Sequence, residues 1–111
     1  MKLVNVLGTY YTLDIVPPND DAMLKRGDCD AWTDKTSKRI VVAEMDDSDL
    51  DKPEVYQKEV IRHEIIHAFL NESGLQEAWE HKPFGHEETT VDWIAKQFPK
   101  LYDAFVEADC L

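Results

Sequence analysis

Two histidines four residues apart, with a glutamate directly after the first, lie in the apolar stretch VIRHEIIHAFL at residues 60–70. On an α-helix, residues i and i+4 lie on one face, so the imidazoles of His63 and His67 can converge on one ion. Zinc accepts neutral imidazole nitrogen, and Glu64, about 100° further round the helix, can reach a water in an open metal position. The H-E-x-x-H spacing therefore predicts two metal ligands and a general base for hydrolysis.

Catalytic zinc takes three protein ligands, so a third ligand is expected elsewhere in the chain. The candidates just downstream are His81, His86, Glu87, Glu88 and Asp92. Glu88 borders the stripe that should pack on the HExxH helix, which gives it the best aim into that interface. Asp92, one turn further on, suits a position that orients an imidazole N–H, whereas Glu87 is expected to face solvent.

The elements that must position these residues differ between the two halves of the chain. Before residue 52, β-favouring stretches alternate with turn residues and predict about four short antiparallel strands. Hairpin turns are predicted at Leu7-Gly8-Thr9 and at residues 34–38. The helical half follows, so the predicted fold class is α+β: a small antiparallel N-terminal sheet, the HExxH helix, and one or two C-terminal helices.

The HExxH helix is predicted to start with Asp51 and Glu54 as a capping box and to stop at Gly74. Its apolar residues recur at helical spacing, so an unpaired imidazole or carboxylate among them would be costly to bury. The alternative interpretation is that His63 and its neighbours form a solvent-facing polar stripe without metal.

Further helices are predicted in the C-terminal part of the chain. One should begin near His86, and Pro99 should begin a separate final helix. The expected buried stripe of the first is formed by Val91, Ile94, Ala95 and Phe98, and the final helix is expected to carry Leu101, Tyr102, Phe105 and Val106.

Composition narrows the classes of function. The chain has 111 residues, 43% of them hydrophobic, and a formal net charge of −11, which fits one domain over residues 1–111, mainly β to residue 50 and mainly α from residue 51. Such a charge argues against binding nucleic acid or an anionic membrane. No stretch approaches the ~20 apolar residues of a membrane span, and a cytoplasmic location is expected. Cys29 and Cys110 are expected to be reduced thiols.

The sequence RHEIIHAFLNESGL followed by HEETTVDWIAKQFPKL resembles the gluzincin zinc metallopeptidases, and among them the short ImmA/IrrE-like proteins of phages and other mobile elements. The resemblance is specific over residues 62–101 and general before them. In that family a sheet precedes the HExxH helix, and a glutamate that opens the following helix is the third zinc ligand. Residues 88–95, ETTVDWIA, match that helix, so the resemblance assigns this ligand role to Glu88.

The resemblance also implies a function. Glu64 would take a proton from a zinc-activated water that attacks a peptide carbonyl, and would pass it to the leaving amine. His81, His86 and Tyr102 are the candidates for oxyanion stabilisation. A peptide or protein substrate would add as a strand to an exposed sheet edge, for which residues 29–33 are the expected segment.

A zinc-dependent metallopeptidase is thus the predicted function. The alternatives are a catalytically inactive metal-binding domain of the same fold that acts through protein–protein interaction, and a small acidic domain that binds no metal.

Overall fold

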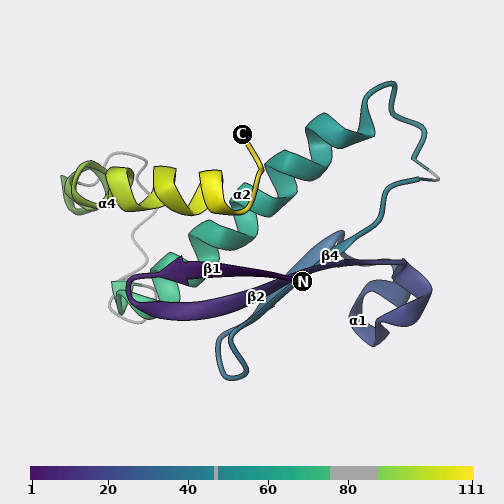
Figure 1. The fold of residues 1–111 in the computed structure, drawn as a ribbon, viewed down its shortest axis with the longest axis horizontal. Coiled ribbons are helices and arrows are strands. Elements are labelled where there is room, and N and C mark those ends of the chain that lie inside the picture. The colour runs from purple at the N-terminus through teal and green to yellow at the C-terminus, as the bar shows by residue number, and fades with distance from the viewer. Residues whose placement is uncertain (47, 76–87) are drawn as a thin grey trace.

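A computed structural model describes residues 1–46, 48–75 and 88–111, of which residues 88–92 and 95 are described by their backbone alone. The chain forms a four-stranded sheet, and both long helices lie on one face of it (Figure 1). The strands are β1 (Lys2–Val6), β2 (Thr9–Val16), β3 (Ala31–Asp34) and β4 (Arg39–Ala43). The helices are α1 (Ala22–Lys25), α2 (Pro53–Glu72) and α4 (Glu88–Glu107), with a 3-10 turn, η1 (Pro18–Asp20), before α1. The predicted α+β fold class is confirmed.

The sheet is mixed, because its two hairpins meet through a parallel pair of strands. The strand order is β1-β2-β4-β3, in which β1/β2 and β3/β4 are antiparallel and β2/β4 are parallel. The expectation of an antiparallel sheet throughout was therefore wrong at β2/β4. The segment with η1 and α1 joins the end of β2 to the start of β3 at the same end of the sheet, and β3 carries the chain back, so that β4 runs in the same direction as β2. The apolar β4, RIVVA, takes the inner position, where four of its five residues are buried, and β3 is left at the edge.

The core forms mainly between one face of the sheet and the two long helices. Because side chains alternate along a strand, Ile40 and Val42 of β4 face this core, while Val41 packs with Leu24 of α1 on the other face. Large fully buried members of the main cluster are Val4, Val6, Tyr11, Ile40, Ile65 and Phe69. The sheet and α2 are thus held rigidly together.

The two predicted hairpin turns are confirmed. Leu7 and Gly8 connect β1 to β2 with φ of 53° and 91°, and the Asn5 side chain accepts a hydrogen bond of 2.8 Å from the Gly8 amide. Between β3 and β4, the Asp34 carboxylate accepts hydrogen bonds from the Thr36 hydroxyl and amide. These bonds lower the pKa of Asp34 to about 2.

Helix α2 begins and ends close to the predicted positions, but its cap differs. Lys52 is the N-cap residue and makes no capping hydrogen bond with its side chain, so the capping box predicted from Asp51 is wrong. Pro53 opens the first turn, where its missing N–H costs little. After the helix, Gly74 adopts a φ of 78°, as the predicted stop requires.

The far end of α2 is tied to the sheet by a polar cluster. The Glu72 carboxylate accepts hydrogen bonds from the Tyr11 hydroxyl, at 2.7 Å, and from the Lys38 ammonium group. The hydrogen bond from Lys38 is the main reason that the pKa of Glu72 is lowered, and burial is the main reason that the pKa of Tyr11 is raised.

Helix α4 differs from the prediction in its length and in its buried face. It runs through Pro99 without a break, so the predicted separate final helix is wrong. Ile94 and Phe98 are 48% and 57% exposed, whereas Leu101 and Ala104 are buried. A proline inside a helix costs about 3 kcal/mol. Packing of the later residues on the core offsets this cost and sets the rotation of the helix.

The end of the chain returns to α2 just before the HExxH motif. Arg62 donates a hydrogen bond of 2.6 Å to the Cys110 carbonyl, and Lys58 donates one of 3.1 Å to the Leu111 carbonyl. Cys29 and Cys110 are both free thiols, in agreement with the prediction, and burial raises the pKa of Cys110. Within the described ranges, none of the helices has the length and apolar character needed to cross a membrane.

Candidate metal site

The two imidazoles of the HExxH motif face each other on the exposed side of α2. Their Nε2 atoms are 3.0 Å apart, and the rings meet edge to face with centroids 4.7 Å apart. Two ligand atoms 2.0–2.1 Å from one tetrahedral ion would be about 3.4 Å apart. A small rotation of either side chain gives that separation, so His63 and His67 are placed to share one ion.

Glu64 lies beneath the histidines and is buried. Its side chain contributes a carboxylate to an otherwise apolar helix face, yet the residue is only 7% exposed. The Thr33 hydroxyl donates a hydrogen bond of 2.8 Å to Oε1, and Oε2 lies 3.9 Å from His63 Nε2. Oε2 accepts no hydrogen bond from the described residues. The carboxylate therefore has one oxygen fixed by the sheet and one that faces the histidines.

These three side chains form a group that could hold a metal ion. One nitrogen or oxygen atom from each of His63, Glu64 and His67 lies within 4.8 Å of the others. Both histidines are exposed, and they border an open pocket of about 340 Å³ that also contacts Thr33 and Asn71. An ion and a small molecule can reach the group from solvent.

The third ligand was predicted to be Glu88. It is the first residue of α4, one of the residues described by backbone alone, and the same limit applies to Asp92. His81, His86 and Glu87 lie outside the described residues. The ligand role of Glu88 stays a prediction.

Tyr102, a candidate for oxyanion stabilisation, is 49% exposed on α4 beside Phe98. It lines neither of the two pockets that border the histidines. The described part of the chain thus gives no support for this role.

Strand β3 brings the sheet edge to the candidate site. It starts at Ala31 within the segment 29–33, and it is an edge strand as predicted. Ala31 and Thr33 project from the same face of β3, and both line the pocket at the histidines. The backbone of an added strand would therefore run past the His63–His67 pair.

Thr33 lies in the predicted edge segment 29–33, but no feature of the sequence assigned it a role in the site. Its partner Glu64 is 31 residues away, so no local spacing connects them. The sequence carries only a weak signal for this contact. Thr33 has a hydroxyl in the predicted edge strand and lies two residues after Ala31, so both side chains project from the same face of that strand, toward the helix that carries Glu64.

No protein-family model, curated protein or solved structure matches this chain.

Proposed function

We propose that this protein is a zinc-dependent peptidase in which His63, His67 and Glu88 bind the ion and Glu64 is the general base. The observation that carries the proposal is the contrast in burial within the motif. Two imidazoles are exposed with converging nitrogens, whereas the carboxylate between them in sequence is buried beside them. A polar stripe facing solvent would expose all three side chains.

The donor set agrees with zinc. Two imidazole nitrogens and one carboxylate form a standard ligand set for catalytic zinc, which leaves a position open. When bound there, zinc supplies Lewis acidity, which lowers the pKa of water and polarises a carbonyl oxygen.

The chain itself supplies the proton transfer. Glu64 takes a proton from the attacking water at Oε2 and gives it to the leaving amine. Thr33 keeps Oε1 turned toward the sheet through its hydrogen bond, so Oε2 is the oxygen that faces the reacting groups. The Glu64 carboxylate is therefore held in one orientation before substrate binds.

Strand β3 supplies the site for an extended peptide. Its inner edge pairs with β4, and no other described strand pairs with its outer edge. A peptide can therefore add to the sheet through main-chain hydrogen bonds, with its backbone beside Glu64.

The decisive experiment separates metal binding from catalysis. Elemental analysis of protein purified without chelator should give one zinc per chain, and an anomalous map at the zinc edge should place it at His63 and His67. His63→Ala and His67→Ala should each lose zinc. Absence of zinc, or a peak away from these histidines, would refute the site.

The ligand role of Glu88 has a matched control in the adjacent acid. Glu88→Gln should weaken zinc binding, measured by competition with a chelating dye, whereas Glu87→Gln should leave it unchanged. Equal effects of the two substitutions would argue against Glu88 as a ligand.

Catalysis is tested with a peptide library generated from a proteome digest, analysed by mass spectrometry. Zinc-loaded wild type should produce new termini, and Glu64→Gln should keep zinc but lose the cleavage. Zinc without cleavage of any peptide or candidate protein would instead favour the inactive metal-binding domain.

A further inference from the structure

A second pocket adjoins the candidate site on the side of the N-terminal half of α2. It has a volume of about 250 Å³ and shares His63, Glu64 and Ala31 with the pocket at the histidines. The two pockets therefore lie side by side along α2 and β3, and together they are called the groove. The volume of the second is enough to admit one long side chain of a bound peptide.

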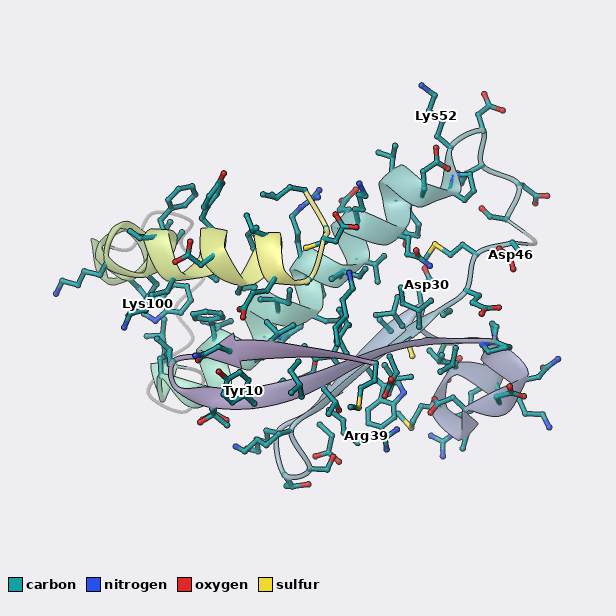
Figure 2. All side chains as sticks on the ribbon, viewed as in Figure 1. Tyr10, Asp30, Arg39, Asp46, Lys52 and Lys100 are labelled. Carbon is teal, nitrogen blue, oxygen red and sulfur yellow. The ribbon has the colours of Figure 1, made fainter. Side chains whose placement is uncertain are left out.

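Two carboxylates flank this second pocket. Asp30 precedes β3, and Figure 2 shows it near the N-terminal half of α2. Glu59 lies one helical turn before His63, on the same face of α2. Among the residues that the structure describes, neither lysine nor arginine lines the pocket. Its electrostatic potential is therefore negative, in a protein whose formal net charge is already −11.

The position of Asp30 is fixed by α2. The Tyr56 hydroxyl donates a hydrogen bond of 2.7 Å to Asp30 Oδ2. That hydrogen bond is the main cause of the raised pKa of Tyr56, and the negative charge of Glu59 raises this pKa further. Both carboxylates therefore lie close to the Tyr56 hydroxyl. Half-buried Val60 and Ala31 supply an apolar wall below them.

The pocket also contains a buried group that has an open position for a ligand. Glu64, more than nine-tenths buried, lines it, and Oε2 of this residue has no hydrogen-bond partner among the described residues. A groove that joins this oxygen, an open strand edge and a negative pocket has the features of a peptide-binding site, rather than of a solvated acidic surface.

We infer that this pocket, flanked by Asp30 and Glu59, binds a lysine or arginine side chain of a peptide that lies along β3. This inference rests on the proposed function for its substrate class. The alkyl part of the side chain packs on Val60 and Ala31, and the cationic end pairs with the two carboxylates. A peptide that adds antiparallel to β3 would end near Asp30, which would put the basic residue on the carboxyl side of the cleaved bond.

The test measures binding separately from cleavage. The probes are fluorescein-labelled mixtures of short capped peptides. Every position is randomised except two adjacent ones, which are both lysine, both norleucine or both glutamate. Binding is measured by anisotropy to zinc-loaded Glu64→Gln protein, which does not cleave the probe. Asp30→Asn and Glu59→Gln are added singly and together. Asp103→Asn with Asp109→Asn is the control, with the same change of charge on exposed sites outside this groove.

An exposed ion pair changes affinity roughly two- to five-fold, so two ion pairs should favour lysine over norleucine by about four- to twenty-five-fold. The Asp30/Glu59 double variant should lose that preference, and the control should keep it. Equal affinity for lysine and norleucine, or a preference that survives the double substitution in a variant that unfolds at the wild-type temperature, would overturn the inference.

Cleavage by the wild-type protein separates this inference from the proposed function. If zinc-loaded protein cleaves the mixtures with no preference for lysine, the peptidase stands and the pocket assignment fails. If lysine is preferred in binding but nothing is cleaved, the pocket stands and the peptidase fails.

Discussion

The hydrogen bond between Thr33 and Glu64 can be tested by replacing Thr33 with valine. Valine has nearly the shape of threonine but no hydroxyl, so the substitution removes the donor from a carboxylate that is only 7% exposed. A hydrogen bond to a charged group contributes about 1.5–3 kcal/mol. Water can reach Oε2 from the open pocket, and valine favours strands slightly, so the lower part of that range applies. We expect Thr33→Val to lower the free energy of unfolding by about 1.5–2 kcal/mol.

Urea unfolding of the metal-free protein measures this loss without any contribution from bound zinc. Thr33→Ser keeps the hydroxyl and should lose less than half as much. In a Glu64→Gln background the acceptor is a neutral amide, so the cost of Thr33→Val should fall by about 1 kcal/mol. Unfolding at the wild-type urea concentration, or an equal cost in both backgrounds, would refute the argument that Thr33 stabilises a buried carboxylate.

Three further predictions concern the fold that holds the site. Gly8→Ala should cost about 1–2 kcal/mol in urea unfolding, because φ is 91° there although an added Cβ meets no atom within 4 Å. Lys38→Met should make stability fall less steeply as pH is lowered. The hydrogen bond from Lys38 lowers the pKa of the Glu72 carboxyl below its ordinary value of 4.5, so ionised Glu72 stabilises the fold above that pH and the stabilisation is lost as pH falls. Urea unfolding over a pH series measures this difference. Leu101→Ala should lower stability by about 2–4 kcal/mol and Phe98→Ala by much less, because Leu101 is buried and Phe98 is exposed.

The parts of the fold that depend on near neighbours could be predicted from the sequence. The extent of α2 follows from its apolar periodicity and from Pro53 and Gly74, and the turn at Leu7 and Gly8 follows from local turn chemistry. The spacing of His63 and His67 on one helix likewise gives a pair of facing imidazoles. In each case the deciding residues lie within a few positions of one another.

The parts that depend on distant contacts were predicted poorly. The parallel pairing of β4 with β2 depends on which strand can be buried on both faces of the sheet. No local sequence pattern shows this. The rotation of α4 was wrong for a similar reason. Its apolar residues lie on more than one face, and the sequence does not show that Leu101, rather than Phe98, meets the sheet.

The candidate site combines these two levels, which explains why the setting of its proposed base is harder to predict than the pairing of its candidate ligands. A helix alone places His63 and His67 side by side, but it leaves the environment of Glu64 undetermined. That environment is created by β3, which is held at the sheet edge by β4 and brings a hydroxyl to Glu64 from 31 residues away. An HExxH sequence on a helix without such a strand would have the same metal ligands, but its carboxylate would be free to turn toward solvent. The position of the edge strand is therefore the feature that supports the proposed hydrolysis rather than metal binding alone.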